Sequence, residues 1–312
     1  MNLLQNIFMD FSKERRATAI ATATAAILAI FKLIIGIMSG SVALLASAVD
    51  SVLDTAISVF NFFAIKKAEE APNDEFQYGK GKVQAIAGVI EGVVITLSGV
   101  YIIVEGIKKL LNDSVTTHLG SSIWVMVVSV VVTYFLVKYL ERVAKETDNI
   151  VIKSDATHYK ADLLSNGVVL LSLFIVWLSG WEIVDAIFGI AIGAYIIYSA
   201  YEIIHESILI LLDRALDGKI VSKIGEIIAS EAEVKGYHYL KTRTDGTHNF
   251  VDFHMVLPPN MTILEAHKIA ENIIEKIVAL DKTKGWLINP HFDPHDDEEQ
   301  NILYFNGKNE NE

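Results

Sequence analysis

The chain contains no cysteine, which excludes disulfide bonds and thiolate metal ligands. A bound metal ion would have oxygen and nitrogen ligands, a set unfavourable for Cu(I) and suitable for zinc, iron(II), cobalt, manganese or cadmium. Acidic residues outnumber basic residues, so the formal net charge of the 312 residues is −12. Such an acidic chain is not expected to bind nucleic acid.

Hydrophobic residues make up 52% of the chain, and almost all of the apolar excess lies before Asp213. We predict a transmembrane domain at 17–212 and a cytoplasmic metal-binding α+β domain at 213–298. Residues 1–16 lack an uninterrupted apolar core and a cleavage site, so we interpret them as a cytoplasmic segment and not as a signal peptide. Residues 299–312 are predicted to be a disordered acidic tail.

The transmembrane domain is predicted to contain six helices. A bilayer core about 30 Å thick needs about 20 mostly apolar helical residues. Six segments meet this requirement: 17–38, 42–65, 83–107, 123–140, 154–178 and 183–212. With the N-terminus inside, lysine and arginine gather on the cytoplasmic side, and the outer segments hold only Lys108 and Lys109. This bias predicts a multi-pass protein of the inner (plasma) membrane with both termini in the cytoplasm.

The second domain is predicted to have the order α-β-β-α-β. Asp245-Gly246 is a hairpin turn signal, and Thr262 with Glu265 matches a capping box at the start of a helix. The apolar periodicity predicts helices and strands at 219–233, 237–244, 248–257, 262–280 and 286–289.

Two matched pairs of metal-ligand residues lie in the predicted membrane helices. Asp50 and Asp54 are four residues apart, and so are His158 and Asp162. This spacing places each pair on one helix face. A lone carboxylate in the bilayer costs about 2.5–3.5 kcal/mol, so these groups need a cation, a proton or a basic partner. Three carboxylates and one imidazole can surround a tetrahedral ion such as zinc.

Other interpretations exist for the remaining polar residues of these helices. His158 alone would be an interfacial histidine near the cytoplasmic end of its helix. We interpret Asp155 as a charge at a helix N-terminus, and Glu91 and Asp185 as structural groups that face water or accept hydrogen bonds.

The segments Ser47-Ala-Val-Asp-Ser-Val-Leu-Asp54 and Asp155-Ala-Thr-His-Tyr-Lys-Ala-Asp162 resemble the two metal-site motifs of the cation diffusion facilitator family. Phe76-Gln-Tyr-Gly-Lys80 and Leu211-Leu-Asp-Arg-Ala-Leu216 resemble further family segments, and the similarity extends to about His295. The resemblance implies a homodimeric metal-cation/proton antiporter with alternating access. The ligand set is similar to that of bacterial members that export zinc or iron(II).

The resemblance also implies a metal site in the cytoplasmic domain, one that steadies the dimer. The residues that match it are His238, His254, His267, His291 and Asp293. We interpret the following His295, Asp296 and Asp297 as a solvated acidic end, with additional metal ligands as the alternative.

The loop after the second helix departs from the family pattern. Asp74 and Tyr78 stand where relatives often have histidines, so we predict that a third metal site is absent or degraded here. Lys80 and Asp213 match a charge pair that links the two domains in relatives. The alternative is a positive-inside lysine and a helix-end aspartate.

Metal export is the leading function, with Zn²⁺ or Fe²⁺ as substrate and Mn²⁺, Co²⁺ or Cd²⁺ as further candidates. The alternative is a membrane metal sensor or scaffold that signals through the cytoplasmic domain without flux. A metallohydrolase would need a general base and a positioned nucleophile. We find no such set, so the chain is not predicted to be an enzyme.

Overall fold

The computed structural model describes the backbone of residues 12–39, 42–111, 120–179 and 183–298. Side chains are described within these ranges except at 36, 39, 42–47, 49–50, 109, 120–123, 169, 172–179 and 183–186. The chain divides into two compact units, one ending at Ile208 and one beginning at Leu209. Each unit is described by itself.

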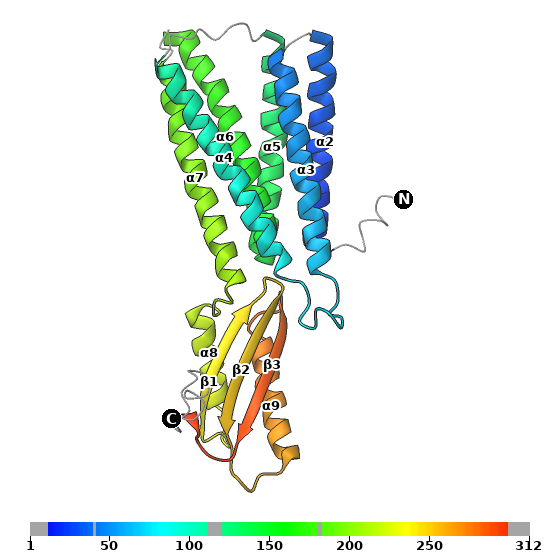
Figure 1. The fold of residues 1–312 in the computed structure, drawn as a ribbon, viewed down its shortest axis with the longest axis vertical. Coiled ribbons are helices and arrows are strands. Elements are labelled where there is room, and N and C mark those ends of the chain that lie inside the picture. The colour runs from blue at the N-terminus through cyan, green and yellow to red at the C-terminus, as the bar shows by residue number, and fades with distance from the viewer. Residues whose placement is uncertain (1–11, 40–41, 112–119, 180–182, 299–312) are drawn as a thin grey trace, which may run out of the picture. The chain divides into compact units, whose positions relative to one another are not determined.

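In its described residues the first unit contains six long helices, α2 to α7, which form a bundle (Figure 1). Their bounds are α2 Lys13–Ser39, α3 Val42–Ala68, α4 Val83–Leu111, α5 Gly120–Thr147, α6 Ile150–Ser179 and α7 Ile183–Leu211. Each has 27 or more residues, and at about 1.5 Å per residue each exceeds the thickness of a bilayer core. The predicted set of six membrane helices is therefore confirmed.

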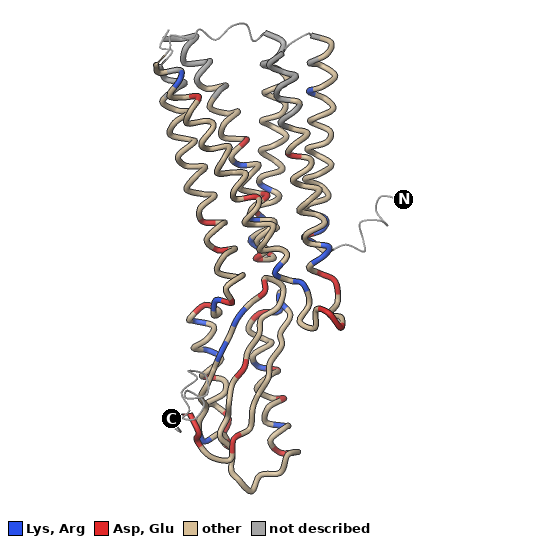
Figure 2. Tube along the Cα trace, in the orientation of Figure 1, with Lys and Arg blue, Asp and Glu red and all other residues tan. Residues whose placement is uncertain are grey.

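Four of these helices, α2, α4, α5 and α7, are long and apolar enough to cross a membrane on their described residues alone. The other two, α3 and α6, carry the predicted metal ligands. Figure 2 shows that the charged residues of the bundle gather toward the end where α2 begins and α3 ends. This is the end predicted to face the cytoplasm.

The second unit is an α+β domain with a three-stranded sheet in the order β1-β2-β3. Its elements are α8 Gly218–Ala229, β1 Gly236–Thr244, β2 His248–Val256, α9 Ile263–Val278 and β3 Gly285–Asp293. The first two strands are antiparallel, and β2 and β3 are parallel. The predicted α-β-β-α-β order is confirmed. The last strand is longer than predicted, because pairing with β2 holds His291 and Asp293 in the sheet.

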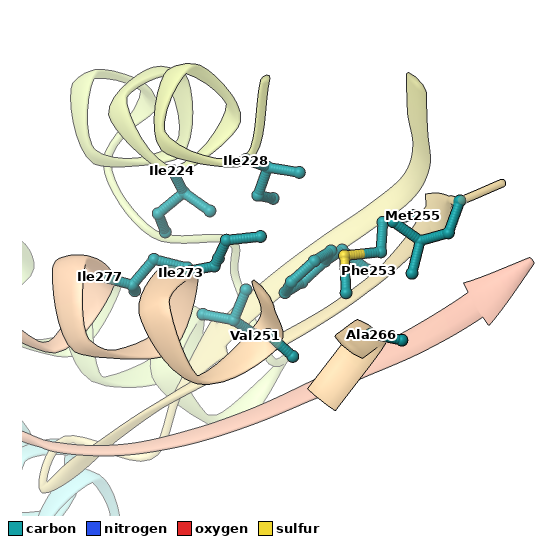
Figure 3. Close-up of a cluster of buried hydrophobic side chains, with 10 residues drawn as sticks. Ile224, Ile228, Val251, Phe253, Met255, Ala266, Ile273 and Ile277 are labelled. Atoms are coloured by element: carbon teal, nitrogen blue, oxygen red, sulfur yellow. The ribbon is translucent and has the colours of Figure 1, made fainter. Parts of the chain in front are cut away.

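One face of this sheet forms the core of the domain (Figure 3). Val251, Phe253 and Met255 alternate along β2 and pack against isoleucines and alanines of α8 and α9. Since strand side chains alternate between the two faces, His254 lies on the opposite face of the sheet. The helices thus cover one face and leave the histidine-bearing face open.

Local chemistry explains the ends of these elements. Asp245 accepts hydrogen bonds from the backbone of Thr247 and His248, and Gly246 adopts a φ of +95°, as the hairpin turn requires. The predicted capping box at α9 is present, with reciprocal bonds between Thr262 and Glu265.

Candidate metal sites in the helix bundle and the α+β domain

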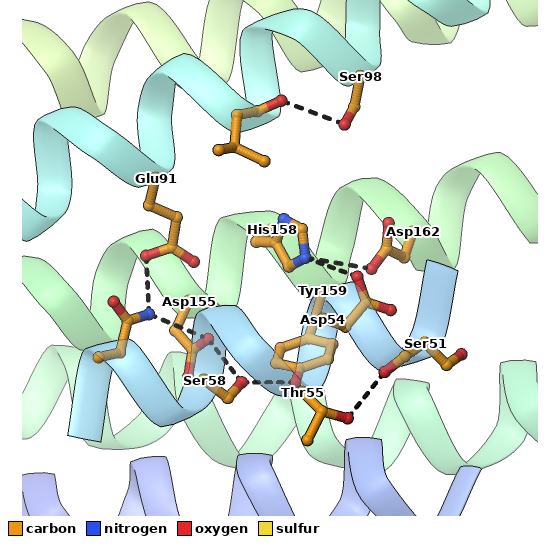
Figure 4. Close-up of polar contacts among 12 residues, drawn as sticks. Ser51, Asp54, Thr55, Ser58, Glu91, Ser98, Asp155, His158, Tyr159 and Asp162 are labelled. Carbon is orange, nitrogen blue, oxygen red and sulfur yellow. Dashed lines mark hydrogen bonds and ion pairs between the residues drawn. The ribbon is translucent and has the colours of Figure 1, made fainter. Parts of the chain in front are cut away.

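Three of the four predicted bundle ligands meet between α3 and α6 (Figure 4). Nε2 of His158 lies 3.1 Å from Oδ1 of Asp54 and 3.7 Å from Oδ2 of Asp162. One ligand atom from each residue lies within 4.8 Å of the other two. Because a zinc–ligand bond is about 2.0–2.2 Å, such a cluster can close around one ion with small side-chain movements.

This group lines a cavity of about 460 Å³ inside the bundle. The side chain of His158 is only 6% exposed, while Asp54 and Asp162 are 21% and 36% exposed. The ligands are thus withdrawn from bulk solvent yet open to the cavity. Asn166, one turn after Asp162, also lines the cavity and donates a 2.8 Å hydrogen bond to the Asp162 backbone carbonyl.

The side chain of the fourth predicted ligand, Asp50, lies outside the described residues, as does that of Asp185. The backbone of α3 includes Asp50 four residues before Asp54, so both positions share one helix face. Its place in the ligand set remains a prediction.

Lys32 of α2 lines the cavity but was not among the site residues predicted from the sequence. It is 8% exposed, lines the same cavity, and donates a 2.8 Å hydrogen bond to Ser51. Its position in a helix facing α3 is the signal that could have identified it, because an intramembrane lysine needs a polar surrounding.

Asp155 is not a charge at a helix N-terminus, and the prediction is wrong here. Helix α6 begins at Ile150, so Asp155 lies inside the helix, with no exposed surface. Glu91 is 1% exposed and does not face water; it accepts a 2.9 Å hydrogen bond from Asn61. Both acids contact residues of α3, and the folding of the bundle buries them.

In the α+β domain, three histidines form a row across the open face of the sheet. His254 on β2 is the register partner of His238 on β1 and of His291 on β3. The ring centroids of His238 and His254 are 5.1 Å apart, and those of His254 and His291 are 4.4 Å apart.

A β-bulge shapes the β1 side of this row. The register between β1 and β2 shifts between His238 and Lys241, and Tyr239 has a φ of +55°. As a result two consecutive residues, His238 and Tyr239, both place their rings against His254. Bulges of this kind re-aim side chains beside functional sites.

Two carboxylates complete this cluster. Oδ2 of Asp293 lies 2.9 Å from Nδ1 of His254 and 3.4 Å from Nε2 of His238. Oδ1 of Asp297 lies 3.0 Å from the same His238 nitrogen. His238, His254, Asp293 and Asp297 each offer a ligand atom within 4.8 Å of the others. His291 is at the edge, with Nε2 3.1 Å from Asp293 and a side chain that is 64% exposed.

Asp297 departs from the expected solvated acidic end. Its side chain is 25% exposed, whereas that of Asp296 is 69% exposed. The turn after β3 places Asp297 beside His238, and sequence spacing alone does not reveal this contact. His295 and Asp296 are exposed as predicted, and Oδ1 of Asp296 lies 3.6 Å from Nδ1 of His238.

His267 does not join this group within the chain. It lies on α9, its side chain is 62% exposed, and its Nε2 is 3.3 Å from Glu271. Because α9 covers the opposite face of the sheet, a role in this metal site remains a prediction.

The loop between α3 and α4 exposes Asp74 and Tyr78. Nearby, Lys67 and Lys80 donate hydrogen bonds to Glu70 at 2.9 and 3.1 Å and hold the pKa of that carboxyl below its usual range. In the other unit Asp213 accepts a 3.3 Å bond from Arg243. The predicted link between Lys80 and Asp213 joins the two units, and it remains a prediction.

Comparison with known proteins places this geometry in a family. Residues 18–212 match the model of the cation efflux transmembrane domain, and residues 216–289 match that of the cation efflux protein cytoplasmic domain. Relatives include the cation-efflux pump FieF of Citrobacter koseri and of Escherichia coli, strains O127:H6 and K12. Each is 32% identical over 263 residues, covering 84% of this chain and 87% of the relative.

The fold and the matched domains define a multi-pass membrane transporter of divalent metal cations. The chain belongs to the cation efflux family, the cation diffusion facilitators.

Proposed function

We propose that this chain exports zinc or iron(II) from the cytoplasm in exchange for protons, by alternating access. The observation that carries the proposal is the meeting of Asp54, His158 and Asp162 at a cavity inside the bundle. The relatives are cation-efflux pumps by name.

The donor chemistry supports this choice of metal. With Asp50 the set is three carboxylates and one imidazole, which zinc and iron(II) both accept. Mn²⁺, Co²⁺ and Cd²⁺ also bind oxygen and nitrogen ligands and belong in any test panel.

Competition between metal and protons supports the coupling. Metal binding requires a neutral imidazole and ionised carboxylates, so a proton and a metal ion occupy the same lone pairs alternately. Protons that enter from outside displace the metal, and metal that enters from the cytoplasm displaces the protons. In alternating access the site opens in turn to the cytoplasm and to the outside, and this alternation converts the competition into export.

The proposed setting is the inner membrane with both termini cytoplasmic, which the lysine and arginine bias of the loops supports. We place the transmembrane domain at 17–212 and the cytoplasmic domain at 213–298. Residues 1–16 and 299–312 are then cytoplasmic ends.

For the cytoplasmic domain we propose a regulatory metal site that steadies a homodimer. His238, His254, Asp293 and Asp297 supply two imidazoles and two carboxylates, a set that fits zinc or iron(II). His291 contacts Asp293 and can add a ligand.

A sensor or scaffold without flux is the alternative that this second cluster favours. Such a protein needs no charge at membrane depth, and burying His158 beside Asp54 and Asp162 is costly without a cation to bind. The bundle cluster therefore favours transport.

Metal uptake into proteoliposomes tests the proposal. We expect Asp54→Ala to lose more transport than the roughly 10–100-fold that removal of an outer-shell partner costs. Asp74→Asn is the matched control, because this carboxylate is exposed in a loop and should leave transport unchanged. Unchanged transport by Asp54→Ala would exclude the site.

A pH-sensitive dye in the same vesicles reports the exchange. Proton movement opposite to metal movement, lost in Asp54→Ala and kept in Asp74→Asn, is the expected result. Metal flux without opposing proton flux would contradict antiport.

A further inference from the structure

Two carboxyl groups of the bundle lie outside the metal cluster and have no part in it. Glu91 of α4 is 1% exposed and Asp155 of α6 is fully buried. Asn61 of α3, also fully buried, joins them: its Nδ2 donates to Glu91 at 2.9 Å and to Asp155 at 3.4 Å (Figure 4).

This group has more acceptor oxygens than hydrogens to give them. Oε1 of Glu91, Oδ2 of Asp155 and Oδ1 of Asn61 are buried and accept no hydrogen bond. A buried acceptor without a donor costs about 1–3 kcal/mol. Turning the Asn61 amide would exchange its oxygen and nitrogen but leave the total number of hydrogens unchanged. The buried hydroxyl of Ser154, which has no other partner, acts on Glu91 and can satisfy one of the three oxygens. Two oxygens remain without a donor, and a proton on either carboxyl supplies a further hydrogen.

The charge of the group leads to the same conclusion. In the part of the chain that the structure describes, neither Glu91 nor Asp155 contacts a lysine or an arginine. The ionisable groups that act on the pair are each other and His158, with Tyr159 beside Asp155. Burial disfavours the ionised form of both carboxyls together, and a proton on one of them removes the conflict.

A metal ion fits this place less well than a proton. Among the described residues the clusters able to offer three ligands are the bundle and sheet groups above, and the Glu91–Asp155 pair belongs to neither. The pair supplies only two carboxylates and an amide oxygen. Zinc-type ions prefer four ligands that include nitrogen.

Hydroxyl groups connect the pair to the metal cavity. Ser58 donates to Asp155 at 3.4 Å, and its oxygen lies 2.7 Å from the hydroxyl of Tyr159. Tyr159 lines the cavity that holds Asp54 and His158. Each hydroxyl can accept a proton on its oxygen while giving up its own, so this row offers a path between the pair and the cavity.

We propose that Glu91 and Asp155, bridged by Asn61, form a proton-binding site separate from the metal ligands and connected to their cavity through Ser58 and Tyr159. The occupant is one proton, held by one or the other of the two carboxyls. Its occupancy does not depend on export; only its use as a source or store of the exchanged proton rests on the proposed function.

Infrared spectroscopy of the full chain in lipid nanodiscs tests the site without metal or gradient. At neutral pH the wild-type protein should show the carbonyl stretching band of a protonated carboxylic acid. The double variant Glu91→Gln, Asp155→Asn should lose that band or most of it. Glu105→Gln is the matched control, because Glu105 lies on the same helix, is partly exposed, and pairs with Lys108, so the band should persist.

Absence of the band in the wild type, or its full retention in the double variant, overturns the proposal. If the double variant does not fold, Glu91→Gln alone serves, since removal of one partner must change the band in area or position. An unchanged band then overturns the site. Because no flux is measured, failure of the export proposal would leave this result unaffected.

Discussion

At the residue scale, each candidate metal site contains one imidazole nitrogen that faces two carboxylates. Nε2 of His158 faces Asp54 and Asp162, and Nε2 of His238 faces Asp293 and Asp297. An imidazole nitrogen between two carboxylates either carries a proton or offers its lone pair to a metal. Metal loading at both places is therefore expected to release protons.

Asp297 is the residue whose role the structure changes most, and neutralising it is a direct test. We expect Asp297→Asn to weaken metal binding at the cytoplasmic site by more than about tenfold, because a charged ligand atom 3.0 Å from His238 is lost. Isothermal titration with zinc, in an Asp54→Ala background that removes the bundle site, measures the change.

Glu298→Gln is the control for that experiment. Glu298 has the same charge, follows Asp297 by one residue and is exposed. If both variants bind zinc as the parent does, Asp297 is no ligand. If both lose the same affinity, the general negative charge of the segment matters and not the position of one oxygen.

At the element scale, helices α4 and α7 approach each other through glycines. A Cβ added to Gly193 would lie 2.8 Å from the Gly99 carbonyl oxygen, and one added to Gly99 would lie 3.0 Å from that of Gly193. Close approach of backbones through small residues is a common basis of helix packing in membranes. Around this contact Ile95, Ile196 and Ile203 are buried.

Adding one methyl group there should destabilise the bundle. We expect Gly193→Ala to cost about 1–3 kcal/mol, the usual penalty for overpacking, because the obstacle is backbone and cannot rotate away. Gly167→Ala on α6 is the matched control, since a Cβ there meets nothing within 4 Å and alanine favours a helix. Thermal unfolding in detergent compares the two, and equal midpoints would contradict close α4–α7 packing.

The capping box of α9 gives the helix a pH-dependent start. Hydrogen bonds from the backbone and hydroxyl of Thr262 to the Glu265 carboxylate lower the pKa of that group. A lowered pKa means that the cap stabilises the helix above the ordinary glutamate pKa. This contribution is lost as the pH falls through the lowered value.

Hydrogen exchange should reveal this dependence. After correction for intrinsic rates, we expect the first-turn amides of α9 to lose protection as the medium becomes acidic. In Glu265→Gln protection should be weaker and nearly independent of pH, because no titratable cap remains. Parallel pH profiles of the two proteins would show that Glu265 does not control this end.

At the scale of the whole molecule, the periodic features were predictable from the sequence. Apolar runs predicted the six helices, and alternation with turn signals predicted the sheet. Helical spacing predicted that His158 and Asp162 share one face of a helix, and the structure brings both together with Asp54 of α3. Local rules suffice for these features because the face on which a side chain lies is set by a repeat of about four residues in a helix and of two residues in a strand.

Contacts between residues far apart in the sequence were not predictable in this way. Asp155 resembled a helix-end charge because the helix was expected to begin near residue 154, whereas α6 begins at Ile150, where Asn149 accepts hydrogen bonds from the backbone of Val151 and Ile152. The contact of Asp155 with Asn61 spans 94 positions. Lys32 and Asp297 likewise acquire their partners from distant segments. A single sequence carries no local pattern for such pairs.

The orientation of the chain in the membrane decides the direction of transport, and the lack of cysteine makes it simple to measure. Helix α4 has 29 residues and is therefore about 43 Å long, so its two ends lie on opposite sides of a bilayer core about 30 Å thick. Asp74, in the loop before α4, and Leu111, at its last turn, are both exposed. Asp74→Cys and Leu111→Cys each introduce the only thiol of the chain.

We expect a membrane-impermeant maleimide to label Leu111→Cys in intact spheroplasts and Asp74→Cys only after lysis. The physical reason is the gathering of lysine and arginine in the segments on the Asp74 side, which the positive-inside rule retains in the cytoplasm. Labelling of both variants after lysis controls for thiol access. Labelling of Asp74→Cys in intact spheroplasts would reverse the orientation, so that metal bound from the Asp74 side would enter the cell instead of leaving it.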